Sequence, residues 1–312
     1  MSPWLPALMT TRSIGSLTVS TVGVGCNNFG WHIDESASHA VIHAALDAGI
    51  THFDTAELYG EGESERILGR GLGRRHQDIV LATKFGLGTN ARPETVRRSA
   101  EASLQRLGTD YIDLYYLHRP DPDTPIADTL GALSELVREG KVREIGCSGF
   151  SSDQLTEAAQ VADEVRFVSL QNEYSLLHRE PENGILNLTR DLDMAFVPYF
   201  PLKSGLLTGK YRLGDAVPEN SRLGGKPGSR FEKTGNRLLT EDNLTIVERL
   251  INFAESHGHT LLELAFGYLL AHQPVASVIA GATKPWQIES NIAAASSWAL
   301  SASEINEVKA LL

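Results

Sequence analysis

Eight short apolar runs, each followed by a helical pattern, limit what this 312-residue chain can fold into. The runs have the length of strands. Several are nearly continuous in Val, Ile, Leu and Phe, as is typical of strands that are buried on both faces. They lie at residues 19–25, 51–56, 78–86, 111–118, 142–150, 167–174, 194–200 and 276–281. Strands that alternate with helices in this way predict a parallel sheet.

The segments between the runs carry helix signals. In residues 36–49 and 125–139, apolar side chains recur at positions i, i+3 and i+4. Thr124 and Pro125 fit an N-cap followed by Pro at the first helical position. Residues 151–154, Ser-Ser-Asp-Gln, fit a capping box that opens the next helix.

Two arrangements of a parallel sheet are open at this point, a closed (β/α)8 barrel and an open, doubly wound sheet. The count of eight favours the barrel. The open sheet would carry the pattern G-x-G-x-x-G after its first strand, and the stretch GVGCNN at residues 23–28 lacks the third glycine. We therefore expect an α/β fold, a single (β/α)8 TIM barrel domain over residues 1–312.

Two segments exceed a minimal barrel. Residues 12–22 alternate between apolar and polar side chains and contain a glycine, which predicts an N-terminal hairpin that closes the barrel floor. Residues 212–243, after the seventh strand, are polar and rich in glycine. We interpret them as a long loop, and a long loop inside a compact domain is typically a lid or a binding loop.

Charge and cysteine content narrow the classes of function. The net charge of −11 argues against nucleic acid as a main partner. No apolar run reaches 18 residues, so we expect no membrane span. Cys26 and Cys147 are far apart, and no secretory leader is evident at the start of the chain, so we expect a cytoplasmic protein. No pattern in the sequence selects an oligomeric state.

Polar side chains stand where several strand runs end, and these ends meet at one face of a barrel. Asp54 ends the second run, Lys84 the third and His118 the fourth, and Tyr59 follows Asp54 in the next loop. Each residue alone has an ordinary structural explanation, such as a cap, a packed ring or a satisfied polar neighbour. Lys84 is the strongest single signal, because a buried lysine needs a partner and Asp54 is on the adjacent strand.

The four residues together predict a proton donor. A lysine beside a phenol favours the phenolate, so we expect Lys84 to lower the pKa of Tyr59. Asp54 would hold Lys84 in place, and His118 would orient a substrate oxygen. The set indicates general acid catalysis by Tyr59 toward a developing alkoxide. No member of the set can deliver hydride, so a cofactor is required.

Several stretches of the sequence resemble the aldo-keto reductase superfamily, a group of (β/α)8 NAD(P)H-dependent oxidoreductases. They are HFDTAELYGEGESERILG, LATKFG, IDLYYLH, IGCSGF, QNEYSLL, VPYFPLKSGLLTGKY and GATKPWQIESN, in the family's order. The bacterial branch that includes aldose dehydrogenases is the most similar. The resemblance implies that Asp54, Tyr59, Lys84 and His118 are the family's catalytic tetrad.

The resemblance also implies a cofactor site. Ser148 and Gln171 match the pair that holds the nicotinamide carboxamide, and Tyr199 matches the aromatic residue that stacks on the nicotinamide ring. The full set of expected cofactor residues is Ser148, Gln171, Tyr199, Leu202, Ser204, Gly205, Leu207, Gly281, Lys284, Gln287 and Asn291.

The adenosine end of this site departs from the mammalian pattern. Gln287 stands where mammalian relatives have an arginine, and glutamine cannot pair with a phosphate as arginine does. Lys284 opens a helix, however, and the N–H groups at a helix N-terminus favour an anion. We therefore expect NADP(H) as the cofactor, with NAD(H) as the alternative.

Three aromatic residues, Phe29, Trp31 and Phe85, are expected to line the substrate pocket. Aromatic walls with few charges indicate small to medium aldehydes, ketones or sugars as carbonyl substrates, or the corresponding alcohols. For Arg119, a solvated charge or an ion pair with Asp121 or Asp123 is favoured over a substrate contact. An NAD(P)-dependent aldose dehydrogenase remains an alternative.

Two rival functions come from other classes. The first is a nucleotide-binding regulatory subunit of the potassium-channel β type, which keeps the same tetrad. The second is a metal-dependent barrel hydrolase. It would need metal-binding His or Asp residues at the end of the first run, where the chain has Cys26, Asn27 and Asn28. We therefore expect no metal.

Overall fold

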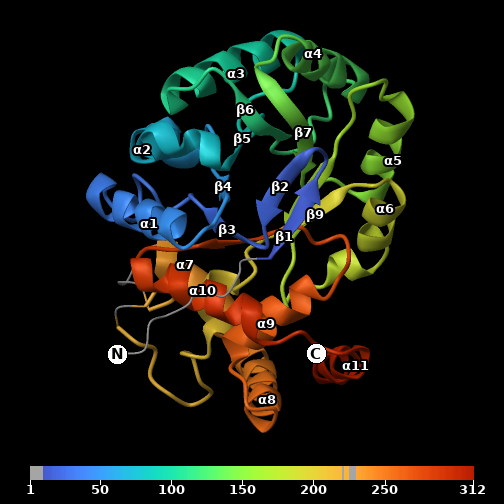
Figure 1. Ribbon diagram of the computed structural model, residues 1–312. Coiled ribbons are helices and arrows are strands. Elements are labelled where there is room, and N and C mark those ends of the chain that lie inside the picture. Colours follow the sequence, from blue (N-terminus) through green and yellow to red (C-terminus); the bar gives the residue numbers. More distant parts are fainter. Residues whose placement is uncertain (1–9, 220, 225–229) are drawn as a thin grey trace.

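The computed structural model describes residues 10–219, 221–224 and 230–312. Eight parallel strands form one sheet in the order β10-β3-β4-β5-β6-β7-β8-β9, and the sheet curves into a barrel (Figure 1). The strands are β3 Val22–Gly25, β4 His52–Asp54, β5 Val80–Phe85, β6 Ile112–Leu117, β7 Val142–Ser148, β8 Ser169–Glu173, β9 Ala195–Tyr199 and β10 Val278–Gly281. A bridge between Phe196 and Val275 joins β9 to the segment before β10 and closes the barrel. The predicted α/β barrel is thus confirmed.

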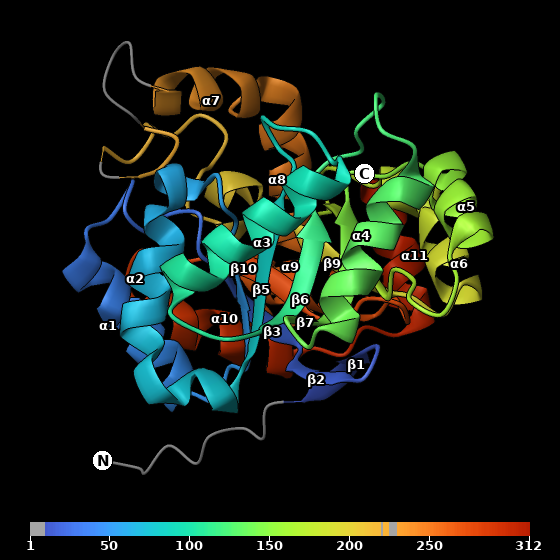
Figure 2. The same cartoon turned by 90° about the horizontal axis from the view of Figure 1, so that it is seen from above.

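Helices surround the strands, as Figure 2 shows from above. They are α1 Glu35–Asp47, α2 Glu63–Leu72, α3 Pro93–Leu107, α4 Ile126–Arg138, α5 Ser152–Val161, α6 Ile185–Asp191, α7 Arg230–Leu238, α8 Glu241–Ser256, α9 Leu261–Leu270, α10 Pro285–Ser297 and α11 Ala302–Leu311. Four 3-10 helices, η1 Tyr59–Gly62, η2 Gly73–Asp78, η3 Glu180–Glu182 and η4 Lys203–Thr208, complete the elements. A large apolar core fills the space between the sheet and these helices.

The expected hairpin closes the amino end of the barrel. It consists of the antiparallel strands β1 Thr11–Ile14 and β2 Leu17–Ser20. Ile14, Leu17 and Val19 are buried in a second apolar cluster inside the barrel. At the hairpin turn, the Ser16 N–H donates to Oε1 of Glu144 on β7 at 2.8 Å. The barrel floor is therefore sealed, and the opposite end is left for chemistry.

The helix starts agree with the sequence signals in one case and differ in another. Ser151 and Gln154 form the expected capping box of α5. Thr124 does not cap α4, because Pro125 is itself the extended cap residue and Ile126 the first helical one. The Thr124 hydroxyl donates instead to Asp121 Oδ2 at 2.7 Å. Here a turn stabilised by a side chain takes the place of the predicted N-cap.

The segment 212–243 is less irregular than expected. It contains α7, and α8 begins within it at Glu241, where the Thr240 side chain accepts from the Asn243 N–H. The long loop predicted after the seventh strand is therefore confined to the residues before α7. In the described part of this loop, the Leu223 N–H donates to the Tyr211 hydroxyl at 3.1 Å, and Leu223 is buried.

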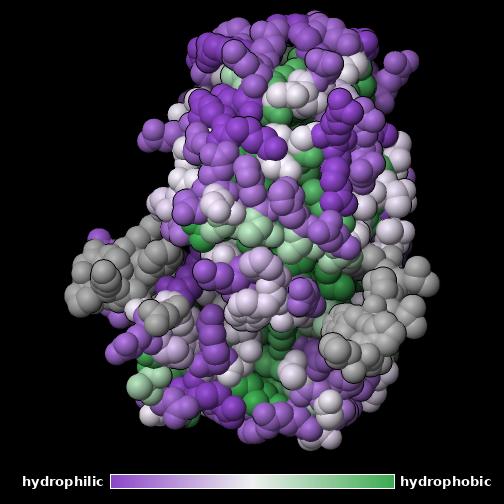
Figure 3. Space-filling model, turned by 60° about the vertical axis from the view of Figure 1, so that its left-hand side comes forward, coloured by the Kyte–Doolittle hydropathy of each residue, from purple (hydrophilic) through white to green (hydrophobic). Residues whose placement is uncertain are grey.

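Among the described residues, no helix combines the length and the apolar content that a membrane span requires. The face drawn in Figure 3 is mostly hydrophilic, with smaller hydrophobic areas between the charged groups.

Gly69 allows α2 to lie against α3, and replacing it with alanine should destabilise the barrel. A Cβ at this position would lie 2.2 Å from the Leu107 carbonyl oxygen, which is backbone and cannot swing aside. We expect Gly69→Ala to lower the free energy of unfolding by about 1–3 kcal/mol in urea titrations. Gly131 on α4 is the matched control, because nothing lies within 4 Å of its Cβ position. Gly131→Ala should stabilise by roughly 0.5–1 kcal/mol. Equal effects of the two substitutions would contradict this packing.

Candidate active site

A buried ion pair lies at the carboxyl end of the barrel. Lys84 Nζ donates to Asp54 Oδ2 at 2.5 Å and to the Thr55 carbonyl at 2.8 Å. Parallel pairing of β4 with β5 brings the two residues together, and both are almost completely buried. Burial alone would lower the pKa of Lys84, but Asp54 and Tyr59 together raise it above its ordinary value. The site therefore holds a fixed positive charge.

Gln171 occupies the second oxygen of the Asp54 carboxylate. Its Nε2 reaches across the barrel from β8 and donates to Asp54 Oδ1 at 2.8 Å. Both carboxylate oxygens are thus bonded, which fixes the plane of the group toward Lys84. The sequence did not predict this contact. It does not indicate which neighbour an amide at the end of a strand will bond.

Tyr59 stands above the ion pair. Lys84 Nζ lies 5.2 Å from the centre of the Tyr59 ring. The loop that carries the tyrosine is tied to β5, because the Glu57 N–H donates to the Lys84 carbonyl at 3.0 Å. Gly60 and Gly62 take left-handed conformations with φ of 58° and 85°, and these turn the chain sharply into α2. Tyr59 stays partly accessible, so a substrate can reach it.

Lys84 lowers the pKa of Tyr59 as expected, but the net direction of the pKa is upward. Burial raises the pKa of the phenol above its ordinary value. Lys84 acts in the opposite direction, and Asp54 offsets part of that effect. Lys84 does not act on the phenol alone, because the negative charge of its partner Asp54 lies close by. Tyr59 consequently carries its proton at neutral pH.

His118 lies edge-on to Tyr59 just after β6. The two ring centres are 5.9 Å apart at an interplanar angle of 83°. The His118 N–H of the main chain donates to the Phe85 carbonyl at 2.8 Å, while side-chain Nδ1 is buried with no partner among the described residues. Burial, followed by the charges of Lys84 and Arg119, lowers the pKa of His118 to about 3. The imidazole is therefore neutral.

The structure gathers the expected nicotinamide residues around this group. Ser148 ends β7, pairs in register with Gln171 of β8, and is buried. Tyr199 ends β9, and its ring lies edge-on to Phe200. These hydroxyl, amide and aromatic groups fit a nicotinamide ring with its carboxamide. The unpartnered His118 Nδ1 beside them is a further polar atom that a ligand can satisfy.

The segment after β9 presents mainly backbone. Leu202 is partly buried against the core, and Leu207 is fully buried, so Leu207 offers no exposed surface to a ligand. Ser204 and Gly205 have φ of 56° and 92°, which turns the chain sharply. Gly281 ends β10 opposite Gly25 of β3, and it is exposed. Exposed backbone without side chains suits a dinucleotide that runs along the rim of the barrel.

The adenosine end differs from the expectation. Lys284 is exposed at the start of α10, and Asn291 on the same helix is buried. The Gln287 side chain folds back on the helix start. Its Oε1 accepts from the N–H groups of Thr283 at 2.7 Å and Lys284 at 3.1 Å. Gln287 thus occupies the N–H groups of the two residues that precede α10, and the expected contact of Lys284 with a 2′-phosphate stays a prediction.

Of the three predicted pocket residues, only Trp31 is accessible, with 52% of its surface exposed and its ring stacked on His32. Phe29 and Phe85 are completely buried, so the prediction that they line the pocket is corrected. Successive strand residues face opposite sides. Because Lys84 faces the barrel interior, Phe85 faces the helices, where it stacks on Tyr115 at 4.8 Å.

Two apolar residues that the sequence analysis missed flank the tyrosines of the site. Leu58 precedes Tyr59 and is 47% exposed, and Phe200 follows Tyr199 and is 45% exposed. Their positions next to Tyr59 and Tyr199 in the sequence could have indicated that they lie near the site.

Arg119 is exposed, which agrees with the expected solvated charge rather than the ion pair. Asp121 accepts from the Ala91 N–H at 2.8 Å and from the Thr124 hydroxyl, and within the described residues no ion pair joins Arg119 to Asp121 or Asp123.

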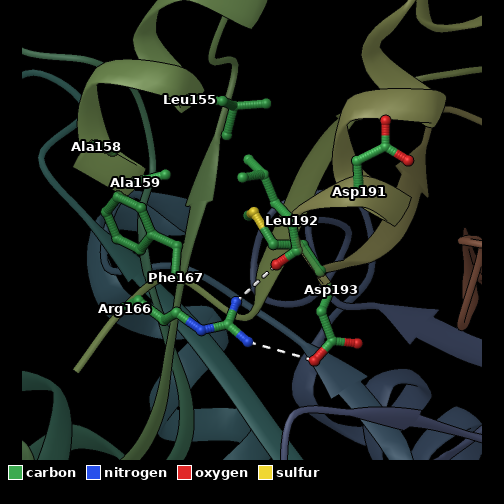
Figure 4. A pocket seen from close by; sticks show the side chains of 9 residues that line it. Leu155, Ala158, Ala159, Arg166, Phe167, Asp191, Leu192 and Asp193 are labelled. Atoms are coloured by element: carbon green, nitrogen blue, oxygen red, sulfur yellow. Dashed lines mark hydrogen bonds and ion pairs between the residues drawn. The ribbon is translucent and has the colours of Figure 1, made fainter. Parts of the chain in front are cut away.

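Two hollows on the described surface are lined by residues outside the tetrad. Figure 4 shows one of about 320 Å³ beside α5 and α6, lined by Leu155, Phe167, Leu192 and Met194 among others. Arg166 crosses it to the Leu192 carbonyl and to Asp193. Its lining comes from α5 and from the segments before β8 and β9, at the closed end of the barrel. A second hollow is lined by Arg212, Leu213, Asp215 and Glu248.

Comparison with known proteins agrees with this geometry. The model of the aldo/keto reductase family matches residues 21–312. A probable voltage-gated potassium channel subunit beta of Arabidopsis thaliana is 36% identical over 92% of this chain and 91% of its own. The aldo-keto reductase yakc [NADP(+)] of Schizosaccharomyces pombe is 34% identical over 91% and 86%.

A solved structure is similar as well. The glycerol dehydrogenase AKR11B4 from Gluconobacter oxydans matches with a TM-score of 0.82 and 31% identity, over 97% of this chain and 94% of its own. A family match across nearly the whole chain, relatives above 30% identity and a shared barrel lead to one conclusion. The chain belongs to the aldo/keto reductase family and is an oxidoreductase by that membership.

Proposed function

We propose that the protein reduces a small carbonyl compound to an alcohol, with a nicotinamide dinucleotide as hydride donor and Tyr59 as proton donor. One observation supports this most directly: a protonated, partly accessible phenol stands over a fully buried ion pair. A phenol in that position can give up its proton to an alkoxide, and the charge it leaves behind forms next to a fixed ammonium.

Each residue of the tetrad has a separate task in this proposal. Tyr59 transfers its proton as the carbonyl oxygen gains charge, and the Lys84 ammonium stabilises the resulting phenolate. Asp54 keeps Lys84 charged and in place, and Gln171 fixes the carboxylate. The neutral His118 ring can hydrogen-bond the carbonyl oxygen without adding a charge. The bound dinucleotide supplies the hydride.

The residues around the tetrad support a cofactor in an extended pose along the rim. Ser148, Gln171 and Tyr199 would hold the nicotinamide, and the backbone of Ser204, Gly205 and Gly281 would follow the phosphates. NADP(H) is supported by Lys284 and by the similarity to the aldo-keto reductase yakc [NADP(+)] of Schizosaccharomyces pombe. The exposed Trp31, Leu58 and Phe200 around the rim support substrates with an apolar part.

Oxidation of an alcohol is the second candidate, since the same groups run the reverse reaction with Tyr59 as base. The similarity to a glycerol dehydrogenase favours a polyol or a sugar as substrate in that direction. The channel-subunit relative supports a regulatory role for the same nucleotide-loaded barrel. Turnover of an aldehyde or a polyol with reduced or oxidised cofactor distinguishes these functions.

Tyr59→Phe tests the proton donor. Loss of the hydroxyl should lower kcat for aldehyde reduction by roughly 10²–10⁴-fold, the usual contribution of a positioned acid. Binding of NADPH, followed by quenching of protein fluorescence, should stay within twofold, about the limit of the method and below 1.4 kcal/mol. The matched control is Tyr111→Phe, since Tyr111 precedes β6 at the closed end of the barrel. A Tyr59→Phe enzyme that keeps a tenth of its turnover would rule out this role.

Acid should destabilise the fold through His118. The neutral folded form has a pKa of about 3, while the unfolded residue titrates near 6.5. Protons therefore bind the unfolded chain first, and stability is lost as the pH falls below about 6.5. We expect His118→Gln to lose less stability than wild type between pH 8 and pH 5, by about 2 kcal/mol, in urea titrations at both pH values. Parallel losses in the two proteins would contradict a neutral, buried imidazole.

A further inference from the structure

A second buried tyrosine lies in the barrel interior beside the ion pair. Across the four neighbouring strands β5 to β8, the residues that pair in register are Lys84, Tyr116, Gly146 and Ser169. Register partners in a sheet point to the same side, so Tyr116 faces the interior as Lys84 does. Tyr116 is completely buried there, in the same apolar cluster as the hairpin that seals the floor. No step of the proposed reaction uses its hydroxyl.

Gly146 lets the Tyr116 ring cross β7. A Cβ at Gly146 would lie 2.4 Å from Cε1 and 2.6 Å from Cδ1 of the ring, so the ring rests directly on the backbone of this glycine. The Tyr116 hydroxyl thereby reaches β8, where it lies 2.8 Å from Oγ of Ser169. A phenylalanine would fill the same space, so packing alone does not account for the hydroxyl.

The Tyr116 hydroxyl also lies next to the amide that bonds Asp54. Ser169 and Gln171 are two positions apart on β8, so their side chains point to the same side of the strand. Gln171 Nε2 donates one N–H to Asp54 Oδ1 at 2.8 Å, and an amide nitrogen carries a second N–H. Burial raises the pKa of Tyr116, and hydrogen bonds with the side chains of Ser169 and Gln171 oppose this effect. One amide therefore meets both a carboxylate and a phenol.

Two contacts hold the plane of an amide better than one. A side-chain amide that is bonded at a single point can still rotate about that bond, whereas a second partner fixes the rotation. Gln171 has Asp54 on β4 as its first partner and Tyr116 on β6 as its second. The carboxylate thus receives its hydrogen bond from a group that is itself held across the barrel.

We propose that Tyr116 is a positioning residue for catalysis, whose hydroxyl holds the Gln171 amide on Asp54 and thereby steadies the ion pair beneath Tyr59. The inference rests on the proposed function, in which Tyr59 exchanges a proton with the substrate oxygen. Tyr116 itself touches neither the substrate nor Tyr59, and it acts only through the amide and the carboxylate.

The charge of Asp54 connects Tyr116 to the proton transfer. Among the described residues, the titratable side chains around the Tyr59 phenol are Lys84, Asp54, His118 and Cys26. Only Asp54 accepts a hydrogen bond from Gln171, and Asp54 raises the pKa of Tyr59. A donated N–H offsets part of the carboxylate charge. If the amide is no longer held, more of this charge acts on the phenol and the pKa of Tyr59 rises further.

Tyr116→Phe tests the proposal, because it removes the hydroxyl and keeps the ring. We expect kcat for the reduction of glyceraldehyde, or of the first aldehyde that wild type reduces, to fall by about three- to tenfold, the effect of one lost hydrogen bond. KM should stay roughly unchanged, since no group that contacts the substrate is lost. In oxidation of the corresponding alcohol, Tyr59 is the base, and the rise of kcat with pH should move upward by about half a unit to one unit. An unchanged kcat and an unchanged pH profile would overturn the proposal.

Tyr115→Phe is the matched control. Tyr115 is the preceding residue of β6, is equally buried, and its hydroxyl has no partner among the described residues. Its ring faces the helices, where it stacks on Phe85. Both kcat and the pH profile should match wild type. Equal losses in Tyr115→Phe and Tyr116→Phe would indicate a general packing effect and contradict the proposal.

A double variant tests the route through the amide. In a Gln171→Met protein at saturating cofactor, Tyr116→Phe should lower kcat no further, because residues that act along one path are not additive. Gln171→Met alone should also move the pH profile upward, which keeps the proposal testable if Tyr116→Phe does not fold. Additive losses, or a Gln171→Met profile at the wild-type pH, would overturn it.

Wild type and Tyr59→Phe separate the two hypotheses. If wild type turns over no aldehyde with NADPH or NADH, or if Tyr59→Phe keeps its turnover, the proposed function is wrong and the inference falls with it. If wild type is active, Tyr59→Phe is not, and Tyr116→Phe equals wild type, only the inference fails.

Discussion

The ion pair between Asp54 and Lys84 is the interaction on which the rest of the site depends. A lysine with no exposed surface can keep its charge only beside a bonded carboxylate, and removing either partner of such a pair typically costs about 3–5 kcal/mol. The barrel provides the pair by placing β4 and β5 side by side, and β8 supplies Gln171 to the remaining oxygen. Closure of the sheet is therefore a condition for the charge, because Gln171 reaches Asp54 only across the interior. The same closure explains why the amino end is sealed by a hairpin, since an open floor would hydrate the pair and weaken it.

The surroundings of each titrating group in the site determine its charge state. Lys84 is held charged, His118 is held neutral and Tyr59 is held protonated, although the three lie within one small region. The ion pair supplies one buried cation and one buried anion, and the phenol and the imidazole beside it are uncharged. In the proposed reaction, charge that develops on a substrate oxygen would meet the Lys84 ammonium across the phenol. Groups whose pKa values are pushed apart in this way are typical of acid–base sites.

The sequence was sufficient for the fold and the position of the tetrad, because both follow from periodicity and from the meeting of strand ends. It was insufficient wherever a side chain chooses among several partners. Thr124 bonds Asp121 instead of capping α4, and Gln171 and Gln287 use their amides within the protein. The Tyr59 pKa was misjudged because burial and Asp54 were not weighed against Lys84. The burial of Phe85 could have been predicted, because Lys84 faces the barrel interior and the next residue of a strand faces the opposite side. No sequence pattern indicated that Phe29 is buried.

The two ends of the proposed cofactor site are built differently, and this has consequences for how each can change. At the proposed nicotinamide end, Gln171 is buried and bonds the Asp54 carboxylate, so a substitution of Gln171 disturbs the ion pair as well. At the adenosine end, Lys284 is exposed and Gln287 bonds only its own helix start. Substitutions at these two positions leave the tetrad untouched. In the proposed site, distance along the rim therefore separates the residues at the adenosine end from the ion pair, and the first can change while the second is preserved.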